Sequence, residues 1–355
     1  MDADPEVIRY LSDHGLLYAR QKIVHNYPHC WRCHTPLIYY AKPSWYIKMS
    51  AFREDLVREN NKVNWVPDYI GQGRFGNWLE NLKDWAISRS RYWGTPLNIW
   101  VCSECGHAQS IGSRQELKEK AKEEVSLDID LHRPFVDQVH LTCPKCGGTM
   151  NREADVLDVW FDSGAMPFAQ LHYPFEHKDE LDGFFPADFI CEGIDQTRGW
   201  FYTLMAISVL YTGKAPYKNV LVNDLVLDKE GQKMSKSKGN TIDPFALFDQ
   251  YGADAVRFYT LYVSPTWLPT KFDEDGLKEV NAKFFRSLRN IYAMFSLYAN
   301  TNGMDASLLS VDPMGRPEID RWLISRYQSL YAFYLENMEA YQYNKVVHAI
   351  SDFVV

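Results

Sequence analysis

Several features that would assign this chain to a membrane, a secretory route or a repeat architecture are missing. No apolar run approaches the length of a membrane-spanning helix. The first ten residues, MDADPEVIRY, lack the basic-then-apolar layout of a signal peptide. The sequence also contains no internal repeat and no low-complexity tract. We therefore expect a soluble globular protein of the cytoplasm.

An excess of positive charge is absent too. The 355 residues include 38 Lys and Arg against 46 Asp and Glu, which gives a formal net charge of −8. This balance argues against a protein that coats nucleic acid without specificity, although local basic patches can still hold a specific RNA. With 46% apolar and 24% charged residues, the chain is long enough for two or three domains and a sizeable core.

Cysteines are few and their number is odd. Six of the seven form C-x-x-C pairs: Cys30/Cys33, Cys102/Cys105 and Cys143/Cys146. Without a secretory signal, this pattern indicates a reducing compartment and metal thiolates, not disulfides. Cys191 is left over in an apolar strand pattern, where we expect a buried free thiol.

The strongest metal signal lies in residues 101–150. Two of the pairs form knuckles there, and the glycine after each knuckle lets backbone N–H groups approach sulfur (Cys102, Cys105, Cys143 and Cys146). The spacer contains a capping box, Ser113-x-x-Glu116, which predicts a helix to about Glu124. Four thiolates favour a closed, tetrahedral Zn²⁺ site, with an iron centre as the less favoured alternative.

The remaining pair, Cys30 and Cys33, supplies only half of a four-ligand zinc site. No second pair is close in sequence, so either the partner ligands lie elsewhere or the site is incomplete in this chain. His34 is a candidate third ligand, but a surface histidine without a ligand role is the simpler interpretation.

Residues 220–240 combine a strand with a lysine-rich loop. The apolar run Val220–Leu227 predicts a buried strand of a parallel sheet, followed by a turn, Asp228–Gly231, whose glycine can adopt a positive φ. Lysines and hydroxyls then alternate in Lys233-Met234-Ser235-Lys236-Ser237. Ammonium groups neutralise charge on a transferring phosphoryl group and hydroxyls donate hydrogen bonds to it. The loop is thus suited to a polyphosphate, and a solvated Lys/Ser loop is the alternative.

Residues 151–219 have the pattern of an α/β sheet. Val156–Gly164 predicts a strand that runs into a polar turn, and Asp188–Glu192 predicts a second strand. A Gly-containing turn and a helix over Phe201–Tyr211, closed by Gly213, come next. Nucleotides bind at such a turn, beyond the carboxyl ends of the strands. Asp195 is placed there to accept hydrogen bonds from ribose hydroxyls, with helix capping as its rival role.

A basic aromatic cluster occurs between these regions. It comprises Arg89, Arg91, Tyr92 and Trp93. Such side chains can stack on single-stranded RNA and neutralise its phosphates. Arginines that snorkel over a Trp-rich core are an equally good interpretation.

The two ends of the chain read as helical. Pro5 and Gly15 bracket a first helix, and Leu16–His25 then predicts a strand. Asp243–Gly252 and Ala253–Val263 predict two further helices. From Asp275 onward, apolar residues at helical spacing predict long helices with core-facing stripes: Leu277, Val280, Phe284, Leu288, Ile291, Phe295 and Tyr298, then Ile319, Trp322, Leu323, Leu330 and Tyr334.

Six motifs carry a family resemblance that covers nearly the whole chain: CWRC, GRFGNWLEN, ISRSRYWGTP, DVWFDSG, EGIDQTRGW and KMSKSKGN. In this order they resemble the isoleucyl-tRNA synthetases, a family of class I aminoacyl-tRNA synthetases. DVWFDSG favours the isoleucine family over the valine family, which is the nearest alternative. The resemblance implies the second half of a Rossmann-type α/β catalytic domain, with ATP and Mg²⁺, isoleucine and tRNA(Ile) as partners of a monomeric ligase.

The resemblance also implies roles for individual residues. Trp160 and Trp200 would line the amino-acid pocket. Lys233 and Lys236 would stabilise the pyrophosphate leaving group. The remaining implied contacts to ATP and the aminoacyl-adenylate are Glu192, Gly193, Asp195, Gln196, Met234, Ser235 and Ser237.

The implied domains follow the motif order. They are a return segment of the editing insertion (1–29), a catalytic-domain connection (30–100), a zinc-knuckle insertion (101–150), the second half of the nucleotide-binding domain with the lysine loop (151–274) and the start of a helical anticodon-binding domain (275–355).

The family's HIGH motif is absent, since no His-x-Gly-His occurs. We therefore expect a fragment that is inactive alone. A non-catalytic zinc-ribbon module that binds RNA remains the alternative from another class.

Overall fold

The computed structural model describes residues 3–30, 33–305 and 312–355, and it divides the chain into two compact units, Met1–Ser44 and Trp45–Val355. The first unit contains helix α1 (Ala3–Asp13), which is followed by Gly15 at φ +65°, as predicted. The predicted strand over Leu16–His25 is wrong, because these residues form neither strand nor helix. Tyr18 and Val24 are almost fully exposed there. A single extended segment needs a neighbouring strand to become part of a sheet.

The second unit is built on a parallel sheet with the strand order β10-β11-β2. These strands are Ala187–Gly193, Tyr217–Asn223 and Asn64–Val66. Helix α8 (Trp200–Thr212) connects β10 to β11, and Gly213 ends it at φ +72°. This confirms the parallel α/β sheet. The short strand β2 is an addition that the sequence did not predict, since it occupies only three residues before Pro67.

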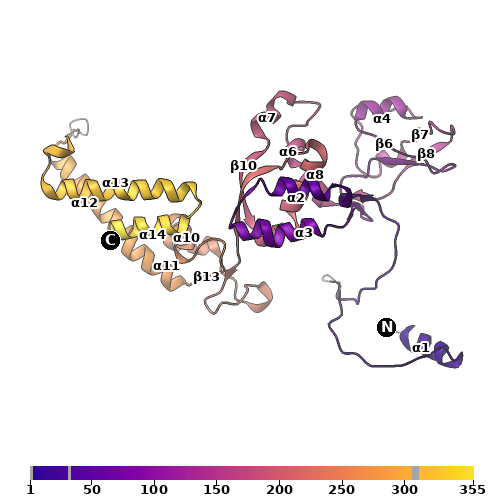
Figure 1. Cartoon of the computed structure of the whole chain (residues 1–355), viewed down its shortest axis with the longest axis horizontal. Helices are drawn as coiled ribbons and strands as arrows, with labels where there is room; N and C mark the ends of the chain where they lie inside the picture. The colour runs from indigo at the N-terminus through magenta and orange to yellow at the C-terminus, as the bar shows by residue number, and fades with distance from the viewer. Residues whose placement is uncertain (1–2, 31–32, 306–311) are drawn as a thin grey trace. The chain divides into compact units, whose positions relative to one another are not determined.

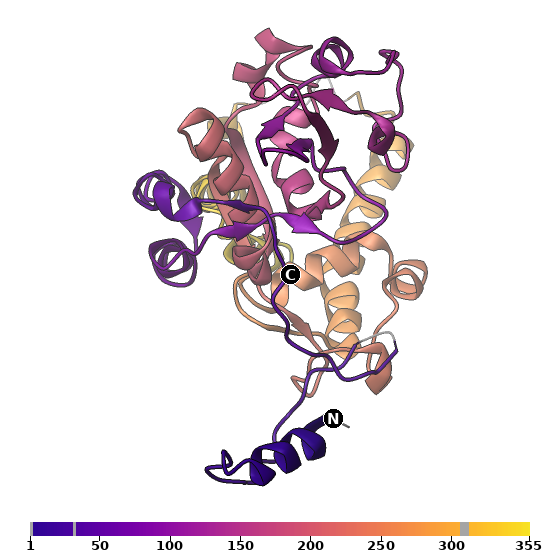
Figure 2. The ribbon, with the colours of Figure 1, turned by 90° about the vertical axis from the view of Figure 1, so that its right-hand side faces the viewer.

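The main hydrophobic core fills the space between this sheet and the helices. Residues Phe201 to Val209 of α8 are all buried. Helices α2 (Arg53–Asn60) and α3 (Gly76–Glu80) lie side by side, lengthwise in Figure 1 and end-on in Figure 2. Shorter elements complete this region: η1 (Met49–Phe52), η2 (Ile70–Phe75), β1 (Tyr46–Ile47) and β3 (Trp85–Ala86).

The predicted strand over Val220–Leu227 is two strands. The first, β11, ends at Asn223, and the second, β12 (Val226–Leu227), pairs in parallel with β13 (Thr270–Lys271). Asp224 separates them: its carboxylate accepts from the amide of Leu225 at 2.7 Å, and its own amide donates to Thr266 O at 2.8 Å. The apolar run therefore passes from one sheet to another.

The polar turn predicted after the strand at Val156 is a helix instead. Strand β9 (Val156–Leu157) pairs with β4 (Ser88–Arg89), and α5 (Val159–Gly164) follows directly. Asp158 caps α5 by accepting from the amide of Trp160 at 3.2 Å. Three further short elements lead to β10: α6 (Met166–Ala169), η4 (Lys178–Glu180) and α7 (Leu181–Phe184).

The cysteine-rich insertion has a sheet and a core of its own. Its antiparallel strand order is β6-β5-β8-β7, from Ala108–Ser110, Ile99–Cys102, Thr149–Arg152 and Leu141–Thr142. Its helices are α4 (Arg114–Lys120) and η3 (Val136–Gln138). Ser113 caps α4 as predicted, at 3.0 Å from the amide of Glu116. The helix ends at Lys120, before the predicted Glu124, and the Glu116 carboxylate accepts from the amide of Gly112, not of Ser113.

The helices after the lysine loop follow the prediction closely. They are α9 (Pro244–Tyr251), α10 (Ala253–Val263), α11 (Glu274–Val280), η7 (Asn281–Phe285), α12 (Arg286–Thr301), η9 (Pro313–Gly315), α13 (Glu318–Glu339) and α14 (Tyr343–Val354). The lysine loop itself contains a short helical turn that was not predicted, η6 (Lys236–Lys238). None of the helices in the described ranges is both long and apolar enough to span a bilayer.

The predicted burial of the apolar stripes is only partly correct. Leu277, Val280 and Phe284 are buried against α10. From Leu288 onward the stripe on α12 is exposed, and so are Ile319, Trp322 and Leu323 on α13. Helical spacing predicts which residues share a face, but a face becomes core only when a second layer covers it. The described part of the chain supplies no such layer over these positions.

The close packing of α5 on α8 gives a test of this fold. A Cβ atom at Gly164 would lie 2.6 Å from Thr203 O and 2.9 Å from Ile207 Cδ1. Because backbone cannot move aside cheaply, we expect Gly164→Ala to lower the free energy of unfolding by about 1–3 kcal/mol. Thermal unfolding measures this, with Gly183→Ala as the matched control, since no atom lies within 4 Å of a Cβ there. Equal melting temperatures for the two variants would contradict the packing.

Candidate functional site

The two tryptophans predicted for the amino-acid pocket meet at the junction of α5 and α8. Trp160 lies in the first turn of α5, and Trp200 is the first residue of α8. The indole N–H of Trp200 donates to Ser163 O at 3.0 Å, which ties α8 to α5. A Cβ at Gly199 would lie 3.1 Å from the Trp160 ring. The absence of a side chain at Gly199 therefore lets the Trp160 indole lie against the start of α8.

The residues predicted for ribose and adenylate lie directly beside this junction. Glu192 and Gly193 end strand β10, and Asp195 and Gln196 lie in the following turn, η5 (Ile194–Arg198). Gln196 Nε2 donates to the Asp195 carboxylate at 3.0 Å, and Gln196 Oε1 accepts from the amide of Trp200 at 2.9 Å. Gln196 thus takes the capping role that was the rival interpretation of Asp195. The Asp195 carboxylate stays exposed as an acceptor.

Arg74, to which the sequence analysis gave no role, supports this turn through a hydrogen bond. Arg74 Nε donates to Thr197 Oγ1 at 2.9 Å, and Thr197 Oγ1 donates to Ile194 O at 2.7 Å. Thr197 is fully buried. Arg74 lies within the motif GRFGNWLEN, and this position was the only sign of its importance in the sequence. The family resemblance implied no role for the residue itself.

The lysine loop is held by two residues that flank it. Asn240 Oδ1 accepts from the amide of Ser235 at 2.9 Å, while its Nδ2 donates to Asp228 at 2.7 Å and to Lys233 O at 3.3 Å. The hydrogen bond from Asn240 lowers the pKa of the Asp228 carboxyl. Gly231 adopts φ +81° in the preceding turn, as predicted. The loop is therefore tied to the turn that precedes it, and Asn240 is an organising residue that the sequence analysis missed.

Side chains of the loop point to different environments. Lys233 and Lys236 are exposed. Met234 packs against the buried cluster of α9 to α11, so its side chain anchors the loop. The Ser237 side chain lies outside the described part of the structure. Gly239 ends the loop at φ +67°.

The four predicted zinc ligands come together, as expected. The Sγ atoms of Cys102, Cys105, Cys143 and Cys146 all lie within 4.8 Å of one another. Two of the separations are 3.5 Å (Cys102 to Cys146) and 3.7 Å (Cys105 to Cys143). Hydrogen bonds from main-chain amides, first that of Cys105, lower the pKa of the Cys102 thiol to about 7. A thiol that ionises near neutrality favours metal binding, and this cluster could hold a metal ion.

The pair Cys30 and Cys33 has no such group around it. Among the described residues, the only set of three or more potential ligands within reach of a metal is the four-cysteine cluster, so His34 does not complete a site. The Cys33 Sγ lies 3.1 Å from the Thr35 hydroxyl, and this hydrogen bond lowers the pKa of the Cys33 thiol to about 7. That Cys30 and Cys33 form only half of a metal site stays a prediction.

The basic aromatic cluster separates into two parts. Arg89 forms its hydrogen bonds within the protein: it donates to the Asp158 carboxylate and to the main-chain oxygens of Ala86 and Ser88. Tyr92 and Trp93 are exposed, by 55% and 74%. Arg89 thus has a structural role through these hydrogen bonds, and the RNA interpretation is left with the exposed residues Arg91, Tyr92 and Trp93.

Cys191 is only half-buried, whereas the sequence predicted a buried thiol. It lies in β10 and accepts a hydrogen bond from Asn223 Nδ2 at 3.1 Å. Burial raises the pKa of its thiol. This keeps it protonated, as expected for a thiol with a structural role.

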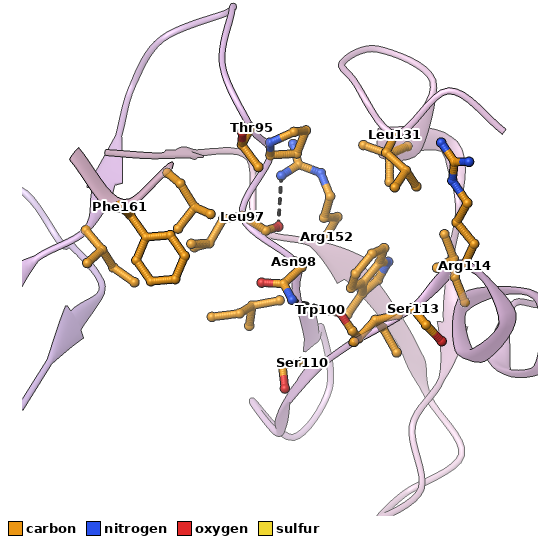
Figure 3. A pocket seen from close by; sticks show the side chains of 18 residues that line it. Thr95, Leu97, Asn98, Trp100, Ser110, Ser113, Arg114, Leu131, Arg152 and Phe161 are labelled. Carbon is orange, nitrogen blue, oxygen red and sulfur yellow. Dashed lines mark hydrogen bonds between the residues drawn. The ribbon is translucent and has the colours of Figure 1, made fainter. Parts of the chain in front are cut away.

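A cavity of about 430 Å³ lies between the cysteine-rich insertion and the base of α5 (Figure 3). Its walls are mainly apolar, with Trp100 and Leu131 on the insertion side and Phe161 on the side of α5. Arg152 borders it and donates to Leu97 O at 3.2 Å. None of the residues predicted for the functional site lines this cavity.

Known proteins resemble this chain in sequence. Residues 1–272 match the family described as tRNA synthetases class I (I, L, M and V). The isoleucine–tRNA ligase of Thermus thermophilus is 49% identical over 354 residues, which cover 100% of this chain and 34% of that protein. Isoleucine–tRNA ligase 2 of Bacillus cereus is 48% identical over 99% of this chain and 34% of its own length. The chain thus spans about a third of the length of these relatives.

Solved structures resemble it in fold. A methionyl-tRNA synthetase of Mycobacterium tuberculosis in complex with methionyl-adenylate aligns with a TM-score of 0.62 at 18% identity, over 94% of this chain and 55% of that one. The LeuRS of Agrobacterium radiobacter K84, in a ternary complex with tRNA and LeuAMS, aligns with a TM-score of 0.58 at 24% identity, over 77% and 36%. The chain belongs to the family of class I tRNA synthetases.

Proposed function

We propose that this chain forms the second half of the catalytic domain of an isoleucine–tRNA ligase. The observation that carries the proposal is the convergence of Trp160 and Trp200 with Asp195 and Gln196 beyond the carboxyl end of β10. Nucleotides bind at this place in α/β sheets. Relatives that are named isoleucine–tRNA ligases favour isoleucine over valine as the amino acid.

The proposed site divides the substrate among neighbouring groups. The branched side chain of isoleucine lies against the indoles of Trp160 and Trp200. The ribose hydroxyls of the nucleotide donate to the exposed carboxylate of Asp195, with Glu192 beside them. Gln196 hydrogen-bonds both to Asp195 and to the first amide of α8, and so fixes the distance between them. The bound nucleotide and the bound amino acid are thereby kept at a constant distance from each other.

The proposed reaction joins these two parts. A carboxylate oxygen of isoleucine attacks the α-phosphorus of ATP, which enters with Mg²⁺, and forms a new P–O bond. The bond from the α-phosphorus to the bridging oxygen breaks, and its electron pair leaves with pyrophosphate. Lys236 and Lys233 neutralise the charge that grows on this leaving group. In a second step the terminal ribose hydroxyl of tRNA(Ile) attacks the isoleucyl carbonyl and releases AMP.

The remaining regions take supporting roles in this proposal. Residues 1–29 are the return of an editing insertion, and residues 30–100 connect it to the sheet. Residues 275–355 begin the part that meets the tRNA, for which their exposed apolar stripes on α12 and α13 leave a large surface. Residues 101–150 hold the metal, and residues 151–274 carry the adenylate site and the lysine loop.

The metal proposed for the cysteine cluster is zinc. Tetrahedral zinc with Zn–S bonds of about 2.3 Å places its sulfur ligands about 3.8 Å apart. The separations of 3.5 Å between Cys102 and Cys146 and 3.7 Å between Cys105 and Cys143 fit this value closely. Zinc held by four thiolates has no open coordination position, so its role here is to fold the insertion and not to react.

Metal analysis tests the zinc site. We expect one zinc per chain in protein purified without chelator. Cys143→Ser should lose it, because three thiolates bind zinc less tightly than four. Cys30→Ser is the matched control and should keep it, since Cys30 and Cys33 offer only two ligands. Full retention in Cys143→Ser would refute the site, and a second zinc lost only in Cys30→Ser would show that the pair is complete.

A chimera tests the proposed activity. This chain would replace the matched 354 residues of the Thermus thermophilus ligase. We expect isoleucine-dependent exchange of pyrophosphate into ATP, with much weaker exchange for valine. The chain alone should give none, since it has no HIGH motif. Absence of exchange in a folded chimera, with zinc bound, would favour the non-catalytic RNA-binding module instead.

In this chimera, Lys236→Ala should lower kcat by roughly 10² to 10³ and leave the KM for isoleucine unchanged. Its ammonium acts on charge that develops only as the α-phosphorus bond breaks, and interactions of that kind raise kcat. Lys236→Arg should rescue poorly, because a planar fork does not replace a compact charge. Steady-state pyrophosphate exchange measures both parameters.

Two further variants control this prediction. Lys229→Ala removes an exposed lysine from the preceding turn and should change neither parameter. Trp200→Ala should show the opposite balance, with the KM for isoleucine raised most. An intact kcat in Lys236→Ala together with a raised KM for isoleucine would show that the assigned role is wrong.

A further inference from the structure

The helix that carries Trp160 is too short to be stable without contacts to the rest of the protein. Helix α5 has only six residues, Val159–Gly164, and an isolated helix of this size is unstable. Leu157 and Phe161, on either side of its start, belong to a small hydrophobic cluster with Ile87 and Leu97. Both also border the cavity of about 430 Å³, where Figure 3 shows Phe161. The C-terminal end of α5 is held on α8 by the close packing at Gly164 and by the hydrogen bond from Trp200 to Ser163 O. The first turn, which carries Trp160, depends in addition on what fixes the residue before the helix.

That residue, Asp158, is held from three directions. Its amide donates to Ile87 O at 2.7 Å. One carboxylate oxygen accepts from the amide of Trp160 at 3.2 Å and so starts the helix. The other accepts from Arg89 Nη2 at 2.6 Å and from the indole N–H of Trp85 at 3.3 Å. The Asp158 side chain is only 8% exposed, so the charge of Arg89 is the partner that compensates its burial.

Arg89 is itself oriented by main-chain atoms. Its Nη1 donates to Ala86 O and to Ser88 O, both at 2.9 Å. The guanidinium therefore has one end fixed on the backbone of β3 and β4 and presents the other end to Asp158. Only a planar group with several donors can satisfy these acceptors together, which a lysine ammonium on a flexible stem does not reproduce.

We propose that Arg89 is a positioning residue for recognition of the isoleucine side chain: it fixes Asp158, and Asp158 fixes the start of α5 and thereby the Trp160 indole. This inference rests on the proposed function, because it takes Trp160 as a wall of the amino-acid pocket. Arg89 does not touch the substrate in this arrangement. Without it, the buried carboxylate has no cation beside it and turns toward water, which removes the cap at Trp160.

Kinetics in the chimera give the first test. Arg89→Met should raise the KM for isoleucine by about tenfold or more, while kcat and the KM for ATP stay within about twofold, because only the amino-acid wall is displaced. Arg89→Lys should rescue poorly. Asp158→Asn keeps the capping oxygen but turns a donor toward Arg89, so it should share this effect. The double variant Arg89→Met/Asp158→Asn should be no worse than either single change.

A matched control separates this effect from general loss of charge. Arg58 on α2 pairs with Asp55 at the same 2.6 Å, but on the protein surface. Arg58→Met should therefore leave both KM values and kcat unchanged. An unchanged KM for isoleucine in Arg89→Met, or an equal loss in kcat and in both KM values, would overturn the proposal.

Amide hydrogen exchange in this chain gives a second test that does not need activity. In Arg89→Met the Trp160 amide should exchange at least about tenfold faster than in the unaltered chain and in Arg58→Met, while amides of α10 keep their rates. Unchanged exchange at Trp160 would overturn the positioning role even if KM moved. If the α10 amides also exchange faster in Arg89→Met, this variant destabilises the whole chain. The milder change Arg89→Lys is then compared with the unaltered chain and with Arg58→Met in the same way.

The two proposals fail in different ways. If the unaltered chimera gives no isoleucine-dependent exchange, the proposed function is wrong, and the hydrogen-exchange result still decides whether Arg89 fixes α5. If the unaltered chimera is active and Arg89→Met matches it in KM for isoleucine, the function stands and the positioning role is wrong.

Discussion

The packing of α5 against α8 leaves no room for a side chain at two positions. At Gly164 a Cβ would lie 2.6 Å from Thr203 O, and at Gly199 it would lie 2.8 Å from Gln196 Oε1 and 3.1 Å from the Trp160 ring. This contact brings together two segments that are separated in sequence by the whole of β10. It also brings the Trp160 indole beside Gln196, which holds Asp195. The amino-acid side and the nucleotide side of the candidate site thus depend on one helix–helix contact.

The sequence predicted what is determined locally. The cysteine cluster follows from C-x-x-C spacing, and α9 follows from its cap at Asp243 and its stop at Gly252, all within a few residues. It did not predict α5, because Val159, Trp160 and Phe161 have strand propensity and only the Asp158 cap starts a helix there. Nor could helical spacing tell that the α12 stripe is exposed, since burial depends on a second layer that the spacing does not encode.

The candidate site was predicted as a set of residues but not as an arrangement. Motifs named Trp160, Trp200, Asp195 and Lys236, and also Gln196, but gave no role to Arg74 or Asn240. Asn240 and Arg74 lie within recognised motifs, but their partners, Asp228 and Thr197, become apparent only when the chain is folded. Supporting hydrogen bonds join residues distant in sequence, and no periodicity marks them. The sequence could therefore name candidate residues, but not the hydrogen bonds that hold them in place.

The cysteine-rich insertion has a physical reason to carry its own core and a cluster of cysteines that could hold a metal. It lies between β4 and β9, which pair with each other, so its two ends must stay close. Closing a flexible loop of this length costs entropy, whereas an insertion with its own core and a cross-linking metal keeps its ends together without that cost. The Arg89–Asp158 ion pair joins the same two ends. The segments that enter and leave the insertion are therefore the ones that also hold the start of α5.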